Sequence, residues 1–407
     1  MTKTPVGPSR RGFLTAAAGA SLASTACGPK APPAPAQPAK AVMSLSDYQP
    51  RSMMVVPSTR IERAKFPVID VHSHIYMFPS LTGKDVGANP VLIPLEQVDQ
   101  IVKWMDELNI QTMINSTSGN RENLARTLKD LPGRYPGRFL VHTEPAWEKI
   151  AEPGYATWQA EEIGRAKKAG AAGIKVLKVL GLYLREKVSE GRLLPVDDPR
   201  FDPMWEAAGS LGMPVFIHTS DPDAFFTPID QYNERWEELG NHPDWAFLGK
   251  DYPSKPELMA ARNRVVARHP RTMFVGHHIA NHPENLGEVS EWLDKYRNLW
   301  VETGARLGEI GRQPHTARKF FEKYQDRIMM GTDATPNAEA YPQQDLKPET
   351  FRCYFRFFET LDEYFDYSPA PIPPQGRWKI YGIGLPDAIL KKVYHNNAAR
   401  LLGLKTI

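Results

Sequence analysis

A short apolar run that ends in two histidines, Phe66-Pro-Val-Ile-Asp-Val-His-Ser-His-Ile75, constrains the fold of this chain most strongly. Its length and composition predict a buried β-strand. Because side chains alternate between the two faces of a strand, His72 and His74 project to one side, about 7 Å apart. Asp70 lies in phase with them, whereas Val71 takes the other face. Two imidazoles so placed can share one metal ion; a pair of ordinary hydrogen-bonded histidines is the alternative.

The amino terminus has the pattern of an export signal rather than of a folded domain. A twin arginine in Ser9-Arg10-Arg11-Gly12-Phe13-Leu14 precedes an uncharged, Ala-rich run that is too short to span a membrane. Residues 1–27 therefore predict export by the twin-arginine route, with either simple cleavage or a lipid anchor at Cys27. Residues 28–60 are expected to form a Pro/Ala-rich tether and lead-in. We expect a periplasmic protein or an envelope-anchored lipoprotein.

The charge balance argues against nucleic acid as a partner. Among 407 residues, 50 are Lys or Arg and 47 are Asp or Glu, which gives a net charge of +3 without a long basic tract. With 42% hydrophobic residues the chain can bury a large core. We expect a small-molecule substrate, and a homo-oligomer is left open.

Segments with the character of strands alternate with amphipathic helical segments throughout the rest of the chain. The expected strands are 66–75, 110–115, 138–143, 173–178, 214–218, 271–277, 299–302 and 327–333. Eight such repeats predict an α/β fold, a parallel (β/α)8 TIM barrel over residues 61–407, rather than a doubly wound sheet. Residues 339–384, which are dense in Phe, Tyr and Pro, predict an insertion with a helix and an extended arm over the barrel mouth. Its aromatics could equally seal the barrel bottom or an oligomer interface.

Histidines and one aspartate stand at the ends of several expected strands, where TIM barrels place their active residues. They are His72 and His74, His218, His277 or His278, and Asp333. Three imidazoles and one carboxylate suit zinc, with manganese or iron as alternatives. A bound ion lowers the pKa of a water to about 7, so that hydroxide becomes available. The general acid or base would then be His277 or the second oxygen of Asp333. Only one of the two adjacent histidines can face the site.

These motifs together resemble the amidohydrolase superfamily, in the branch that contains aminocarboxymuconate-semialdehyde decarboxylase. The resemblance covers nearly all of the chain after residue 65. The segments that carry it are Ile69-Asp-Val-His-Ser-His74, Gly173-Ile-Lys175, Pro214-Val-Phe-Ile-His218, Phe274-Val-Gly-His277, Gly331-Thr-Asp333, Leu385-Pro-Asp-Ala-Ile-Leu and Asn397-Ala-Ala-Arg-Leu-Leu. It implies a metal-dependent barrel in which His277 activates water or substrate. The metal ligands that it implies are His72, His74, His218 and Asp333.

Three further residues are candidates for contact with the substrate, namely Lys175, Glu302 and Arg306. Lys175 is interpreted as a charge partner of the substrate or of the ligands, with a barrel-interior ion pair as the alternative. No second set of ligands is evident, so we expect one divalent ion. Asp70 is expected to orient its neighbours.

Three functions compete. The first is a hydrolase that uses metal-activated water on an ester, lactone or amide of a small organic substrate. The second keeps the same site but is a non-oxidative decarboxylase of an aromatic or muconate-like acid, with Lys175 and Arg306 as carboxylate clamps. The third is an envelope lipoprotein that binds a ligand without catalysis, against which the complete set of metal ligands argues.

Overall fold

The computed structural model describes residues 42–44, 47–77, 86, 91–249, 251–336, 342–370 and 374–407. It divides into two units, Met1–Ser52 and Met53–Ile407, and the second contains all the helices and strands of the described residues. The expected export signal, Cys27 and most of the tether lie outside the described residues. Within the described part of the chain, no helix combines the length and the apolar character that crossing a bilayer requires.

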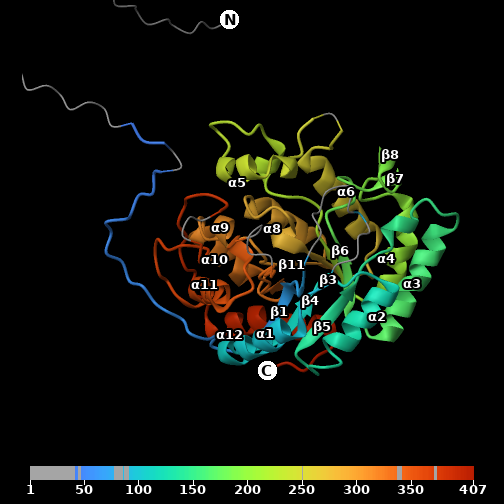
Figure 1. Ribbon diagram of the computed structural model, residues 1–407, viewed down its shortest axis with the longest axis horizontal. Coiled ribbons are helices and arrows are strands. Elements are labelled where there is room, and N and C mark those ends of the chain that lie inside the picture. The colour runs from blue at the N-terminus through green and yellow to red at the C-terminus, as the bar shows by residue number, and fades with distance from the viewer. Residues whose placement is uncertain are drawn as a thin grey trace, which may run out of the picture. The chain divides into compact units, whose positions relative to one another are not determined.

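Eight parallel strands form the centre of the second unit, paired in chain order (Figure 1). They are β1 (Val68–Ser73), β4 (Ile110–Asn115), β5 (Phe139–Thr143), β6 (Gly173–Val176), β9 (Val215–Ile217), β10 (Phe274–Gly276), β11 (Leu299–Glu302) and β12 (Ile328–Met329). The last strand meets the first through a parallel bridge between Ser73 and Ala334 and a hydrogen bond of 2.7 Å from the His74 amide to the Ala334 carbonyl. The predicted (β/α)8 barrel is confirmed.

Helices surround the strands (Figure 1). The longer ones are α1 (Leu95–Leu108), α2 (Arg121–Asp130), α3 (Tyr155–Ala169), α4 (Asp202–Ser210), α6 (Lys255–Arg268), α8 (Leu286–Lys295), α10 (Pro314–Lys323) and α11 (Pro348–Glu359). In α1 the buried residues recur every three or four positions, which is the spacing that places one apolar stripe against the barrel. Ser254 and Glu257 form a capping box that begins α6.

Shorter elements complete the second unit. The hairpins are β2 (Tyr76–Met77) with β3 (Val91–Leu92) and β7 (Arg185–Lys187) with β8 (Glu190–Leu193); the short helices are α5 (Trp236–Asn241), α7 (His277–Ala280), α9 (Leu307–Ile310), α12 (Asp387–Lys391) and α13 (Asn397–Leu402). Single turns are η1 (Trp147–Lys149), η2 (Pro199–Phe201), η3 (Asp223–Phe226), η4 (Pro243–Trp245), η5 (Pro342–Gln344) and the π-turn η6 (Lys392–Asn396) that joins α12 to α13. Gly403, with φ 70°, ends α13.

An apolar cluster fills the barrel interior at the end opposite the site. Its members are Ile69, Val71, Ile114, Phe216, Val275, Trp300 and Met329, with Ala398 and Ala399 of α13. Residues from six strands can contact one another only inside the barrel, so α13 closes this end. Val71 was expected to face away from the histidines. The register of β1 against β4 shifts between Asp70 and Ser73, and this irregularity breaks the strict alternation.

The segment 339–384 contributes both to the outer ring and to the mouth. Helix α11 lies among the outer helices beside α1 and α10 (Figure 1), and Phe358 packs against Phe321 of α10 with ring centroids 5.7 Å apart. The helix therefore does not cover the mouth, contrary to expectation. Gln344 and Gln375, which flank it in the sequence, do line the cavity at the mouth.

Candidate active site

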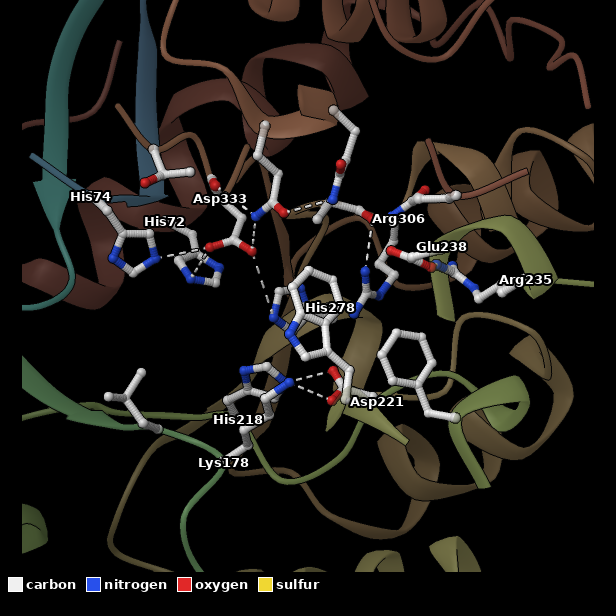
Figure 2. A pocket seen from close by; sticks show the side chains of 18 of the residues that line it. His72, His74, Lys178, His218, Asp221, Arg235, Glu238, His278, Arg306 and Asp333 are labelled. Carbon is white, nitrogen blue, oxygen red and sulfur yellow. Dashed lines mark hydrogen bonds and ion pairs between the residues drawn. The ribbon is translucent and has the colours of Figure 1, made fainter. Parts of the chain in front are cut away.

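A cavity opens at the carboxyl ends of the barrel strands (Figure 2). Its empty volume is about 960 Å³ including the opening to solvent. Most of the residues predicted from the sequence line it, namely His72, His74, Lys175, His218, Arg306 and Asp333, together with His278. Two predicted residues, His277 and Glu302, lie behind this wall instead.

His72, His74 and Asp333 form one of two groups of candidate ligands among the described residues, and the other is His72, His277 and Glu302. In the first group, Nε2 of each imidazole lies 2.9 Å from Oδ1 of Asp333, and the three ligand atoms lie within 4.8 Å of one another. Burial opposes ionisation of Asp333, but His72 and His74 outweigh burial and hold the pKa of this carboxyl well below its usual value. Gln344 donates a hydrogen bond to the other oxygen, Oδ2.

The protonation of His72 tests whether this group fits a cation. Nδ1 of His72 lies 3.1 Å from Oε1 of Glu302, which can only accept, so Nδ1 carries the proton. In the neutral ring the lone pair of Nε2 then faces Oδ1 of Asp333, an arrangement of two acceptors that a cation stabilises, and Nζ of Lys175 lies 3.0 Å from the same Nε2. Burial opposes the charged ring, but Asp333 outweighs it and raises the pKa of His72. The donor set fits a divalent metal ion.

His218 shares the cavity without joining this tight group. Its ring centroid lies 4.4 Å from that of His278 (Figure 2). Nε2 lies 3.1 Å from the Ser220 carbonyl and 3.5 Å from Oδ1 of Asp221. Because the carbonyl can only accept, Nε2 carries the proton and Nδ1 keeps the lone pair that a metal ion needs. Burial lowers the pKa of His218 to about 4, so the ring is neutral at pH 7.

Glu302 organises the histidines from behind. Its Oε1 lies 3.1 Å from Nδ1 of His72, 3.0 Å from Nδ1 of His277 and 2.7 Å from the amide of His278. The Gly304 amide donates to Oε2. This fully buried carboxylate thus fixes ring orientations and makes no contact with the cavity, which differs from the predicted role in substrate contact.

Lys175 connects the same network to the cavity. Its Nζ lies 3.0 Å from Nε2 of His72 and 2.7 Å from Nε2 of His277. His277 therefore has both ring nitrogens occupied, one by Glu302 and one by Lys175, and is not free to take a proton from a water. Burial, partly offset by Asp333, lowers the pKa of Lys175 to about 8.

His278 presents the free nitrogen that His277 lacks. Its Nδ1 lies 2.7 Å from the Gly304 carbonyl and must donate to it, which leaves the lone pair on Nε2. Nε2 lies 3.9 Å from Oδ2 of Asp333. Burial, with a further effect of Arg306, holds the pKa of His278 well below its usual value. The site thus contains two proton acceptors side by side, a neutral imidazole and an ionised carboxylate.

Asp70 has the orienting role that was expected of it. Its Oδ1 accepts hydrogen bonds from the amides of His72, at 3.1 Å, and Thr332, at 3.0 Å, and Oδ2 accepts from the Thr332 hydroxyl at 2.6 Å. These bonds tie β1 to the chain segment after β12 and so bring the two halves of the candidate metal site together.

Arg306 is a further cationic residue of the cavity wall. It is 6% exposed, its Nη1 donates to the Ala305 carbonyl at 2.8 Å, and its Nε has no hydrogen-bond partner. Among the described residues no carboxylate lies within ion-pair distance of it. Arg235, which also lines the cavity, is by contrast held by Glu238 at 2.6 Å and by Glu309. Arg306 is therefore a buried cation that still lacks an anion.

Several lining residues were not predicted from the sequence. They include Lys178, Asp221, Arg235, Gln344 and Gln375. The only signal for Asp221 was its position three residues after His218. Lys178 ends the expected strand 173–178 but was not singled out there. The other three come from loops without a hydrophobic period, and no local pattern distinguishes them.

The fold and the histidine–carboxylate group define a metal-binding TIM barrel of enzyme type. The family model for amidohydrolases of the Amidohydro_2 group matches residues 69–404, and the chain belongs to this family. Members of the family are metal-dependent enzymes, both hydrolases and decarboxylases. No curated protein shows a significant match to this chain.

Solved structures similar to this chain include the following three, of which the first two have a TM-score of 0.50 and share its fold. The 2,6-dihydroxybenzoate decarboxylase from Rhizobium is 17% identical, with 83% of this chain and 99% of that chain covered and a TM-score of 0.50. A dihydroxybenzoic acid decarboxylase from Polaromonas sp. JS666, with bound manganese and 2-nitroresorcinol, is 15% identical over 83% and 97%, with a TM-score of 0.50. A probable 2-pyrone-4,6-dicarboxylic acid hydrolase from Acinetobacter baumannii is 12% identical over 83% and 100%, with a TM-score of 0.48. At these identities the similarity concerns the fold alone.

Proposed function

We propose that this protein is a metal-dependent hydrolase of an ester, lactone or amide bond in a small substrate that carries a carboxylate. The observation that supports hydrolysis is the pair of proton acceptors, Nε2 of His278 and Oδ2 of Asp333, 3.9 Å apart. One water molecule can donate a hydrogen bond to both atoms at this separation. A water held between two bases is poised to act as a nucleophile.

The proposed ligands are His72, His74, His218 and Asp333. A divalent ion bound by them would acidify a water and polarise the substrate carbonyl. His278 accepts the proton of the attacking water as the new bond to the carbonyl carbon forms. When the bond to the leaving oxygen or nitrogen breaks, His278 returns this proton to the leaving atom. Its Nδ1 hydrogen bond to Gly304 keeps Nε2 directed at the reacting atoms.

Arg306 supports the second part of the proposal, that the substrate carries a carboxylate. A guanidinium that is buried without a carboxylate partner is energetically unfavourable, because the charge has lost water and gained little in return. A substrate carboxylate would provide the missing partner, with charge-assisted hydrogen bonds to the unpaired Nε and the cavity-facing nitrogens. Leu177, Phe225 and Trp245 of the cavity wall would enclose the apolar part of the substrate.

A non-oxidative decarboxylase is the second candidate, and Lys175 favours it. Loss of carbon dioxide leaves a carbanion that must be protonated, and this requires a donor beside the substrate. Lys175 lines the cavity as a buried ammonium, and Arg306 would bind the carboxylate in this reaction as well. Hydrolysis is preferred because His278 and Asp333, which face the reacting position, are both acceptors.

The test compares two panels of compounds with the metal-loaded protein. Carboxylated esters, lactones and amides report hydrolysis, and incorporation of ¹⁸O from labelled water identifies water as the nucleophile. Aromatic and muconate-like acids report decarboxylation by release of carbon dioxide. Hydrolysis that is lost in His278→Asn but retained in His282→Asn supports the proposal. Release of carbon dioxide without hydrolysis would select the decarboxylase, and no turnover with either panel would favour a binding protein.

The identity of the ion and the location of the protein complete the proposal. Zinc is the first candidate for a site of imidazoles and one carboxylate, and manganese and iron fit the same donors. We propose export through the twin-arginine route, with Cys27 as the position of a lipid anchor. Metal analysis of the purified protein and fractionation of cells that express Cys27→Ala would test these two points separately.

A further inference from the structure

The turn that presents His278 to the cavity has a backbone conformation that its sequence does not favour. Four successive residues, His278 to Asn281, have positive φ angles of 56°, 54°, 52° and 60°. None of them is glycine, and the left-handed region is especially unfavourable for a β-branched residue such as Ile279. Contacts from outside the turn must therefore hold it in place.

The two ends of the turn are fixed by neighbouring strands and loops. At the beginning, the His278 amide donates to Oε1 of Glu302 at 2.7 Å. At the end, Oδ1 of Asn281 accepts a hydrogen bond of 2.8 Å from the Thr219 amide. The middle of the turn, around Ala280, is held by a different part of the molecule.

Arg262 of α6 reaches this middle section from the outer ring of helices. Its Nη1 donates a hydrogen bond of 2.6 Å to the Ala280 carbonyl. Nε and Nη2 donate to Oδ1 of Asn263 at 3.1 and 2.8 Å, and the guanidinium lies 4.4 Å from the ring centroid of Trp292. The side chain is fully buried, and no carboxylate of the described residues forms an ion pair with it.

A buried guanidinium without a carboxylate partner contributes little to stability by itself. Burial lowers the pKa of Arg262 to about 9, because the charged form of the guanidinium is unfavourable away from water. An apolar residue would fill the space between α6 and Trp292 without this loss. Of the polar contacts that an apolar residue would lose, the hydrogen bond to the Ala280 carbonyl is the one that reaches the turn.

We propose that Arg262 is a positioning residue that holds the left-handed turn of residues 278–281 and so keeps Nε2 of His278 directed into the cavity. It acts through the backbone of Ala280 and touches neither the cavity nor the candidate metal ligands. The catalytic part of this inference rests on the proposed role of His278. The structural part, that Arg262 holds the turn, is independent of the reaction.

Hydrogen exchange of backbone amides measures the structural part without any substrate. We expect Arg262→Met to accelerate exchange in the peptide that contains residues 277–282 by about tenfold or more, because a charge-assisted hydrogen bond is lost. Peptides from β1 and β11 should be unchanged. Arg264→Met is the matched control, since Arg264 lies on the exposed face of the same helix and pairs with Asp197 at 2.6 Å. Unchanged exchange at 277–282, or equal acceleration in every peptide, would overturn the proposal.

A glycine rescue separates positioning from general stability. Glycine adopts the left-handed region without strain, so Ala280→Gly should make the turn less dependent on Arg262. In the Arg262→Met background it is expected to slow the exchange of residues 277–282 about threefold or more. No rescue would show that Arg262 does not act through the turn. Should Arg262→Met fail to fold, Arg262→Lys takes its place in the same exchange measurements. Lysine keeps the positive charge but lacks the planar set of N–H donors of the guanidinium.

Turnover of an ester, lactone or amide substrate tests the catalytic part. Arg262→Met is expected to lower kcat by about tenfold or more with KM little changed, since Arg262 has no contact with the cavity, and Ala280→Gly should restore part of kcat. Normal kcat together with faster exchange would refute the link to His278. If the wild-type protein hydrolyses no substrate, the proposed function fails, and the exchange experiment still decides whether Arg262 holds the turn.

Discussion

Replacing Glu302 with glutamine should weaken metal binding while leaving the barrel folded. The carboxylate of Glu302 accepts hydrogen bonds from Nδ1 of His72, Nδ1 of His277 and the amides of His278 and Gly304. All four partners are donors. Glutamine offers one acceptor oxygen and one amino group, so it cannot satisfy all of them.

The magnitude follows from the better of the two glutamine orientations. If the oxygen takes the Oε1 position, the side-chain NH2 of glutamine faces the N–H of Gly304. Two buried donors then face each other without an acceptor, which costs about 1–3 kcal/mol. The loss of the negative charge also makes Nε2 of His72 a weaker ligand. Removal of such supporting partners typically weakens metal binding about 10- to 100-fold, which corresponds to about 1.4–2.8 kcal/mol.

Competition with a chromophoric chelator gives the metal Kd of each variant, and thermal unfolding of the metal-free proteins checks the fold. Glu144→Gln is the matched control. Glu144 is a largely buried carboxylate at the end of β5 that accepts a hydrogen bond of 2.7 Å from the Gly119 amide and touches none of the ligands. A folded Glu302→Gln protein that binds metal within about threefold of the wild type would refute the reasoning.

Three further outcomes are expected. Arg306→Met should raise KM for a carboxylated substrate by about tenfold or more in steady-state kinetics, because the lost charge-assisted hydrogen bonds contribute about 1.5–3 kcal/mol; an equal effect on an uncharged analogue would contradict this. Gly331→Ala should abolish metal binding in equilibrium dialysis, since its Cβ would overlap Oε2 of Glu302 and lie 2.9 Å from Cβ of His72, and normal binding would argue against this packing. Burial raises the pKa of Glu144 from 4.5 to about 7, so the folded state loses stability as the pH rises from 4.5 through 7. Glu144→Gln removes this loss, and in urea unfolding it should be up to about 3 kcal/mol more stable than the wild type at pH 8 and unchanged at pH 4; equal stability at pH 8 would refute the shift.

The architecture could be read from the sequence because hydrophobic period and strand ends are local signals. Each expected strand corresponds to an observed one, from β1 at Val68–Ser73 to β12 at Ile328–Met329. The barrel topology then brings the polar ends of distant strands together, so His72, His74 and Asp333 meet although 259 positions separate the last two. Long-range geometry was predictable here because the fold class fixes it.

Side-chain roles outside the strands could not be read in the same way. Arg235 and Gln375 reach the cavity from loops whose shape depends on tertiary contacts. The spacing of hydrophobic residues in the sequence carries no information about such contacts. The register shift in β1 is a second example, since strict alternation placed Val71 on the face away from the histidines. Glu302 was found as a polar residue at a strand end, but only its four hydrogen bonds show that it supports the histidines.

The pair His277 and His278 shows most clearly where reasoning from strand geometry stops. Alternation along a strand allows one of two neighbours to face the site, and His277, the first residue after β10, satisfies the motif. The chain ceases to be a strand at Gly276, where an added Cβ would lie 2.8 Å from Cα of Ala280. From there the left-handed turn, which costs about 1–2 kcal/mol per residue, leaves both imidazoles beside His72, with ring centroids 3.9 Å (His277) and 5.2 Å (His278) from that of His72. His277 is held by Glu302 and Lys175, and His278 keeps a free nitrogen. In our proposal the handedness of four backbone residues therefore decides which histidine transfers the proton.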